Sequence, residues 1–456
     1  MMKKIIKMMA VLILTIMTVA CESFLETDLP KDQVGQTLVF NDDRTADAAL
    51  TYVYTQMRNS GFFAGSRLGM GYLLACYTDE MEVVNPQSTN HRHFYEGTVV
   101  AGNAAIKTIW DNTYKQIYTV NSVLEGLNNA SGMSEEVRIR LQGEALAVRG
   151  ILHFYLSQSF GAVPYVITTD YNINRKTEKM PASQVMELAV ADLEQAQQYL
   201  SDVYTSSERV RINRSVARAF LARMYLYQQK WDKAFENAQL VIEQAEYELE
   251  PLDNVFIKES RSAIWQLKPD AEGRNTAEGT EYIFTSVPAP QGRLALALVN
   301  GFETGDLRKE KWIKKVGTAT EDYCAFKYKV RGASSPAKEY SVIVRIEEMY
   351  LIAAEAEMET GDFAGFNFYI NALRTRAGLD MVDATGAGQA VDMLLQERRV
   401  EFFCEFGHRF YDLKRRNRLN NLVSVKPHWK PHYNLLPLPE NELLLNPALL
   451  PQNIGY

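Results

Sequence analysis

Two stretches of the chain, residues 215–246 and 345–378, carry small and bulky apolar residues at the spacings expected of paired helices. In the first stretch, Leu221 and Tyr225 share one face of a predicted helix, and Ala234 begins a second helix after a short turn. Small side chains let two packed helices approach closely, while larger apolar side chains fill the space between them. The pattern predicts antiparallel helix pairs of the tetratricopeptide kind, which stack into a scaffold.

The second stretch repeats this arrangement around a turn at Gly361 and Asp362. Phe363 follows that turn in the same way that Trp231 follows the turn of the first stretch, so both bulky residues are predicted to wedge a helix pair. Residues 247–341 separate the two stretches. The sequence therefore predicts two interrupted units rather than a continuous solenoid.

Apolar residues at spacings of three and four predict further helices, which together indicate a mainly α fold. These helices are predicted at residues 43–57, 109–127, 134–160 and 181–200. Trp110, Trp231 and Trp265 lie in contexts typical of packing residues.

The segment 247–341 differs in kind, because it contains short β-branched or aromatic runs bounded by Gly, Pro and Asp. Short strands are predicted at residues 264–267, 282–287 and 323–330. Residues 60–102 form a second stretch that is predicted to be irregular. Loops and short strands mounted on a rigid frame commonly carry binding residues, so we expect the ligand face there.

The N-terminus predicts an export signal over residues 1–20, with Lys3, Lys4 and Lys7 ahead of an uncharged apolar run at residues 8–20. This run is shorter than the about 20 residues that span a bilayer. A small residue directly before Cys21 is typical of bacterial lipoprotein processing, which predicts Cys21 as a lipid attachment site. The alternative is ordinary secretion, with cleavage nearby and Cys21 left as a free thiol.

Charge and cysteine content exclude several classes of protein. The chain carries 49 Lys and Arg against 56 Asp and Glu, and no basic cluster marks a predicted face, which argues against a nucleic-acid ligand. The scattered Cys76, Cys324 and Cys404 are predicted to be small buried hydrophobes. The histidine pairs lack a third ligand at the spacing of known metal motifs, so no metal or cofactor is predicted. These pairs are His91 with His93, and His428 with His432.

Glu397, Glu401 and Glu405 recur every four residues and are predicted to form one stripe of a helix. A glycosidase requires two carboxylates on opposite sides of a sugar, which one helix stripe builds poorly. We therefore interpret the stripe as an internal Glu–Arg network with Arg398, Arg399 and Arg409 nearby, and phenylalanines packed beneath it. The sequence contains no nucleophile elbow, phosphate-binding loop or dinucleotide-binding fingerprint, so we predict that the protein is not an enzyme.

Five motifs together resemble the SusD/RagB family of outer-membrane lipoproteins. They are ERRVEFFCEFGHRFYDLKR at residues 397–415, RIEEMYLIAAEAEMETGD at 345–362, the C-terminal LLPLPENELLLNPALLPQNIGY, EALAVRGILHFYLSQSFGAVPYV at 144–166, and the cluster of Phe302, Glu303, Asp306 and Arg308. Cys21 followed by Phe24, Leu25 and acidic residues fits the same pattern.

The resemblance implies a single SusD-like domain over residues 21–456, with helical hairpins as a scaffold and an irregular ligand-binding face. Tetratricopeptide-like units are expected within residues 43–246 and 342–378, the irregular insertion at 247–341, and the C-terminal family region at 387–456. It further implies a lipoprotein anchored in the outer membrane at the cell surface. In this family the protein acts as a lid that delivers its ligand to a SusC-type TonB-dependent transporter, without catalysis.

The ligand implied by the resemblance is an oligosaccharide, or a peptide as in the RagB branch. A sugar's apolar C–H face suits the face of an aromatic ring, while flanking polar groups bind its hydroxyls. The candidate aromatic residues are Tyr72, Phe94, Tyr95, Tyr282 and Phe284, and the candidate polar residues are Asn90, Arg92, Arg274 and Asn275. Two other functions remain open: a surface glycosidase, and a scaffold that binds only protein.

Overall fold

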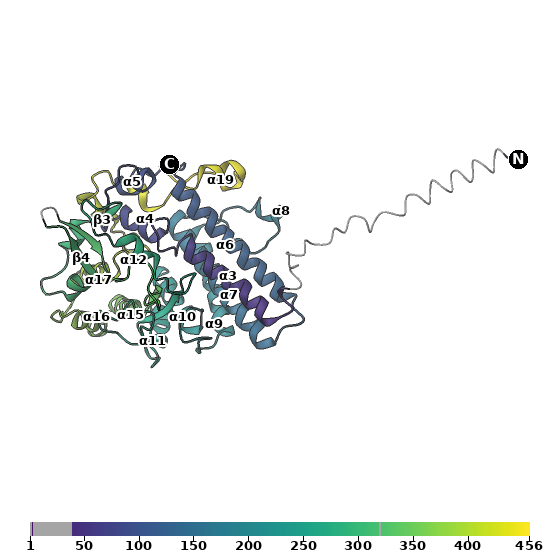
Figure 1. Ribbon diagram of the computed structural model, residues 1–456, viewed down its shortest axis with the longest axis horizontal. Coiled ribbons are helices and arrows are strands. Elements are labelled where there is room, and N and C mark those ends of the chain that lie inside the picture. The colour runs from purple at the N-terminus through teal and green to yellow at the C-terminus, as the bar shows by residue number, and fades with distance from the viewer. Residues whose placement is uncertain (1, 3–38, 319–320) are drawn as a thin grey trace.

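The computed structural model describes residues 2, 39–318 and 321–456 (Figure 1). The predicted signal at residues 1–20 and the predicted lipid site Cys21 lie outside the described residues. Within that part of the chain, no helix combines the length and apolar character needed to cross a membrane.

Helices make up most of the described chain, which confirms the predicted mainly α class. The long helices are α3 (Asp43–Asn59), α6 (Ala104–Asn128), α7 (Glu135–Phe160), α9 (Ala182–Tyr199), α10 (Arg214–Tyr227), α11 (Trp231–Ile242), α15 (Ile346–Thr360), α16 (Phe363–Arg376) and α17 (Ala387–Phe402). Asp42 caps α3 by accepting hydrogen bonds from the backbone N–H groups of Arg44 and Thr45. Leu50 and Val53 lie on the buried face of this helix, as its spacing predicts.

Successive long helices pack side by side in the order α6, α7, α9, α10, α11, α15 and α16 (Figure 1). Gly150 of α7 allows one close approach in this layer. A Cβ atom there would lie 2.8 Å from the carbonyl oxygen of Ala189 in α9, so glycine permits the contact. Trp231 begins α11 and Phe363 begins α16, which confirms their predicted positions after the two turns.

The helical layer is continuous in space, which corrects the prediction of interrupted units. α11 packs directly against α15, although residues 247–341 separate the two hairpins along the chain. The packing is possible because this insertion leaves the layer and returns to the same place. Strand β2 (Ala263–Leu267) pairs antiparallel with strand β6 (Ser341–Arg345), and β6 leads directly into α15.

The insertion contains short elements on one side of the helical layer (Figure 1). They are α12 (Ala277–Tyr282), β3 (Gly292–Leu294), α13 (Leu296–Val299), α14 (Leu307–Trp312), β4 (Ile313–Val316) and β5 (Asp322–Ala325). β4 pairs with β5, and β3 pairs with β1 (Met81–Val83), so two further two-stranded antiparallel sheets form here.

Two strand predictions within the insertion were wrong in part. Residues 282–287 form no strand, because Thr276 caps α12 by accepting from the Gly279 N–H and the helix runs through Tyr282. The strand predicted at 323–330 is β5 and ends at Ala325. Beyond it the chain turns inward, where Lys327 Nζ donates to the Glu401 carbonyl. The strand at 264–267 is confirmed as part of β2.

Residues 60–102 contain regular elements that the sequence pattern did not predict. They are α4 (Met70–Tyr77), β1 and α5 (Thr89–Glu96). All eight residues of α4 are buried, so the helix lacks the polar face from which a helical period is recognised. The prediction of an irregular stretch was therefore wrong here.

The C-terminal region completes the fold with short helices. They are α18 (His408–Arg415), η1 (Leu419–Ser424), η2 (Pro431–Asn434), α19 (Glu440–Leu445) and η3 (Pro447–Leu449), and α8 (Tyr171–Asn174) lies in the segment between α7 and α9. Of the C-terminal helices, α18 packs against α17 and α19 lies beside α6 (Figure 1). One large apolar cluster extends from Phe40 to Leu449 and includes Trp110 and Trp265, while Trp231 packs partly buried against it. Cys76, Cys324 and Cys404 are buried and unpaired, as predicted.

The predicted stripe of three glutamates is interrupted, although the buried network is real. α17 ends at Phe402, and positive φ angles at Cys404 and Phe406 reverse the chain before α18. Glu401 nevertheless lies beside Arg308, Arg345 and Arg376. These partners differ from the predicted ones, since Arg398 pairs with Asp412, and both Arg399 and Arg409 pair with Asp79. Phe402, Phe403 and Phe406 are buried, as predicted.

Candidate functional site

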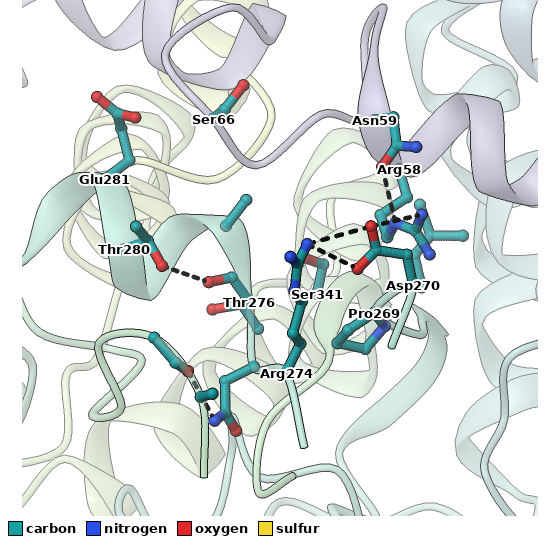
Figure 2. Close-up of a pocket in the computed structure, with 15 residues that line it drawn as sticks. Arg58, Asn59, Ser66, Pro269, Asp270, Arg274, Thr276, Thr280, Glu281 and Ser341 are labelled. Atoms are coloured by element: carbon teal, nitrogen blue, oxygen red, sulfur yellow. Dashed lines mark hydrogen bonds and ion pairs between the residues drawn. The ribbon is translucent and has the colours of Figure 1, made fainter. Parts of the chain in front are cut away.

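A cavity of ≈ 470 Å³ lies where the end of α3, the end of β2, α12 and the loop before β6 meet. Its volume falls within the range of small-molecule sites, about 300–1,000 Å³. Figure 2 shows its labelled residues, with Arg58, Asp270 and Arg274 on one side and Thr280 and Glu281 on the other. Because Leu267 and Ser341 pair at the end of the β2–β6 sheet and both line the cavity, the sheet fixes its base.

Two arginines share one carboxylate on the first wall (Figure 2). Arg274 Nη1 donates to both oxygens of Asp270, at 3.1 and 3.2 Å, while Arg58 Nη2 lies 3.9 Å from Asp270 Oδ2. Burial lowers the pKa of Arg58, and the neighbouring Arg274 lowers it further, while Asp270 opposes both effects. Arg274 and Asp270 are more than one-third exposed, so this pair is open to a ligand.

Asn275 lines the cavity but uses its whole amide to hold the loop before β6. Its Nδ2 donates to the Gly332 carbonyl and to Ser334 Oγ, both at 2.9 Å. Its Oδ1 accepts from the backbone N–H groups of Lys338, at 2.8 Å, and Glu339, at 3.1 Å. Asn275 therefore positions one wall of the cavity.

A buried carboxyl group lies directly behind the cavity. Ser341 lines the cavity and its Oγ donates to Glu278 Oε2 at 2.7 Å. Burial raises the pKa of Glu278 to about 7, and the carboxylates of Glu339 and Glu405 contribute in the same direction, while the Ser341 hydrogen bond opposes them. Glu278 also lines a void of ≈ 20 Å³ together with Tyr72 and Tyr282.

A second hollow adjoins the cavity beyond Arg274. It has a volume of ≈ 320 Å³, shares Pro269 and Arg274 with the cavity, and is also lined by Glu208, Lys268 and Tyr340. Arg274 lines both hollows, so its guanidinium is within reach of a ligand in either one.

The nine predicted ligand residues occupy four different places. Arg274 and Asn275 lie in the cavity wall, whereas the rings of Tyr72 and Tyr282 lie 5.7 Å apart in the interior beneath it. Phe284 belongs to a small separate core with Cys324. Direct ligand contact by these residues stays a prediction.

The other four predicted residues lie together on α5, which packs against α4 and β1. Arg92 forms an ion pair with Glu96, and the Asn90 carbonyl accepts from Asn103 Nδ2. Phe94 is fully buried against Tyr77, and Lys426 Nζ lies 3.9 Å from the centre of the Tyr95 ring. Their role in ligand binding also stays a prediction.

Sequence reasoning missed most of the cavity wall. The missed polar residues are Arg58, Asn59, Ser66, Asp270, Thr276, Thr280, Glu281 and Ser341. Arg58 lies in the last turn of α3, where a basic residue is already explained by its interaction with the helix dipole. Asp270, four residues before Arg274 in a polar loop, was the one signal available in the sequence.

The described chain is a scaffold of stacked helices, and the insertion supplies most of the residues that line its cavity. A family profile described as "Starch-binding associating with outer membrane" matches residues 44–226, and one described as "SusD family" matches residues 312–456. The chain belongs to the SusD/RagB family.

The relatives match over nearly their whole length. SusD-like proteins P25 and P2 of Formosa agariphila are 23% and 26% identical to the chain. The alignments cover 96% and 94% of this chain, and 97% and 96% of the two relatives.

Solved structures share the fold at low sequence identity. A SusD superfamily protein from Bacteroides vulgatus has a TM-score of 0.80 at 20% identity, over 91% of this chain and 99% of that chain. A laminarin-binding SusD-like protein has a TM-score of 0.75 at 22% identity, with the same coverage. Surface glycan-binding protein A from Bacteroides uniformis has a TM-score of 0.77 at 21% identity, over 90% of this chain and 99% of that chain.

Proposed function

We propose that this protein is a cell-surface nutrient-binding lipoprotein that captures an oligosaccharide in the cavity between α3, β2 and α12. The observation that carries the proposal is the exposed Arg274–Asp270 pair in a hydroxyl-rich cavity. Guanidinium and carboxylate groups together donate to and accept from sugar hydroxyls, and Thr280 adds a hydroxyl on the facing wall. The laminarin-binding and glycan-binding relatives support the same ligand class.

The proposed role is binding without catalysis. The carboxylates around Glu401 are buried among arginines, so they have no access to a ligand. Burial alone would raise the pKa of Glu401, but Arg376, Arg345 and Arg308 hold it well below its usual range. A carboxylate held in its charged form is a poor general acid at neutral pH.

We further propose that lipid at Cys21 anchors the protein in the outer membrane, where it acts as a lid over a SusC-type TonB-dependent transporter. The family description that includes association with the outer membrane supports this location. Gentle detergent extraction of outer membranes, followed by affinity purification, tests the partnership. A β-barrel transporter is expected to co-purify, and its consistent absence would remove the lid role while leaving ligand binding intact.

Ligand binding is tested by calorimetric titration with laminarihexaose, maltohexaose and a mixture of short peptides. We expect a hexasaccharide to bind, and Arg274→Ala to weaken that binding about tenfold, as the loss of a hydrogen bond to a charged group predicts. Arg138→Ala on α7 is the matched control, because Arg138 forms a surface ion pair outside the cavity. Peptide binding with the same dependence on Arg274 would instead establish the RagB-type alternative.

A further inference from the structure

A second large cleft, of ≈ 480 Å³, lies between α6, α8 and the C-terminal α19. It shares no lining residue with the cavity around Arg274. Both clefts have the volume of a small-molecule site. The cleft therefore requires its own explanation.

Aromatic side chains dominate one wall of this cleft. Trp110, Tyr114 and Tyr118 follow one another at intervals of four residues on α6, so they lie along one face at steps of about 6 Å. The rings of Trp110 and Tyr114 lie 4.9 Å apart. Tyr171 of α8 adds a ring that is 72% exposed, and Tyr118 is 51% exposed. Such exposed rings on a concave surface are typical of ligand contacts.

Hydrogen bonds from side chains to backbone carbonyls hold these walls in place without a ligand. Tyr114 Oη donates to the Pro164 carbonyl at 2.9 Å, which ties α6 to the segment after α7. Asn174 Nδ2 donates to the Thr168 carbonyl at 2.7 Å, and Asn446 Nδ2 donates to the Thr177 carbonyl at 3.0 Å. The cleft is therefore preformed, which reduces the entropy lost when a ligand binds.

The charges around the cleft balance one another. Asp111 pairs with Lys107, while the guanidinium of Arg175 lies 5.7 Å from the centre of the Tyr171 ring, and Glu442 faces the cleft from α19. Asp111, Glu442 and Arg175 line the cleft, and Lys107 pairs with Asp111 from outside it, so the cleft selects neither an anion nor a cation. These polar groups also disfavour an acyl chain, because a wholly apolar ligand would leave them unpaired on burial. A neutral ligand with apolar faces and many hydroxyls fits both features.

From these observations we propose that the cleft between α6, α8 and α19 is a second carbohydrate site, which binds a neutral oligosaccharide with its pyranose faces against Tyr114, Tyr118 and Tyr171. Asp111, Glu442 and Arg175 are then available to its hydroxyls. The site is independent of the cavity around Arg274, so it stands or falls separately from the function proposed for that cavity.

The test compares the wild-type protein with a Tyr118→Ala, Tyr171→Ala double variant. Tyr52→Ala is the matched control, since Tyr52 is 53% exposed on α3 and outside both sites. Native mass spectrometry and calorimetry with laminarihexaose and maltohexaose measure stoichiometry and affinity. We expect the double variant to lose one bound hexasaccharide, and each single variant to weaken that site about fivefold, in line with the energy of one aromatic contact. Tyr52→Ala should bind as the wild type does.

A crystal of the wild-type protein soaked in either hexasaccharide gives the direct readout. Sugar density against Tyr118 and Tyr171 would support the site. An empty cleft at millimolar sugar, or unchanged stoichiometry in the double variant, would overturn it. Loss of a co-purifying membrane protein from the double variant, with hexasaccharide binding unchanged, would also overturn it and identify the cleft as a protein interface.

Discussion

Arg345 Nη1 donates to Glu401 Oε1 across 2.6 Å, and both side chains are at most 2% exposed. Arg345 ends β6, the strand that follows the insertion and leads into α15, while Glu401 lies near the end of α17. Arg308, from the middle of the insertion, and Arg376, from α16, converge on the same carboxylate. A single glutamate thus joins the insertion, the helical layer and the C-terminal region.

Replacing Glu401 with Gln should destabilise the protein severely. The change keeps the shape of the side chain but leaves three buried guanidinium groups facing a neutral amide, and breaking a buried ion pair costs about 3–5 kcal/mol. Urea denaturation at neutral pH measures the free energy of unfolding. Glu136→Gln, at an exposed position on α7, is the control and should unfold as the wild type does. A Glu401→Gln protein of wild-type stability would contradict the structural role of this network.

Glu278 should make stability fall as the pH rises. Its pKa is about 7 in the folded protein, above the ordinary value of 4.5. The folded protein binds this proton more tightly than the unfolded chain does. The resulting stabilisation of the fold is fully present below about pH 4.5, and it is lost as the pH rises through 7. The total change is on the order of 3 kcal/mol.

The Glu278→Gln variant isolates this effect, because an amide does not titrate. Urea denaturation of both proteins at pH 5, 6, 7 and 8 gives the difference in their free energies of unfolding. This difference should shift in favour of the variant as the pH rises. A difference that stays constant with pH would show that Glu278 remains ionised throughout.

Asn275→Ala should loosen the loop that forms one wall of the cavity. The substitution removes all four hydrogen bonds that tie residues 332–339 to the site, at about 1 kcal/mol for each bond. We expect faster proteolysis within this loop and weaker hexasaccharide binding, with the helical circular dichroism retained. Asn441→Ala, at an exposed position on α19, is the control. A variant whose loop resists protease as the wild-type loop does would refute this positioning role.

Cys21→Ala should release the protein from the membrane without changing its fold. Along the sequence, Cys21 lies well before Asp43, where α3 begins. In cell fractionation, the wild-type protein should appear in the membrane fraction and the variant in the soluble fraction. The purified variant should keep the wild-type melting temperature. Continued membrane attachment of the variant would eliminate Cys21 as the lipid site.

The helical hairpins were predictable because their packing requires a repeating pattern of side chains along the chain. Leu221 and Tyr225 lie one turn apart on the buried face of α10, and local spacing alone identifies that face. The continuity of the layer was not predictable in the same way. The contact of α11 with α15 depends on the pairing of β2 with β6 across a long insertion, which no local pattern encodes.

The cavity was only partly predictable, because its walls come from segments far apart in the sequence. Arg274 was found through its polar loop, but Arg58 is brought to it by the packing of α3 against β2. Tyr72 and Tyr282 were predicted from their aromatic character, and tertiary packing placed both rings in the interior. Residue type alone does not distinguish a ring that packs the core from a ring that contacts a ligand.

The pairing of β2 with β6 brings the start and the end of the segment 268–340 to the same point on the helical layer. Apart from the contacts that it makes with the frame, such as the ion pair of Arg308 with Glu401 and the pairing of β3 with β1, a segment fixed at two neighbouring points can change in length and sequence without moving the helices that hold it. Evolution can therefore vary the cavity wall while the helical frame stays constant. For protein engineering, the same geometry marks Leu267 and Ser341 as the junctions at which one relative's binding segment can be exchanged for another's.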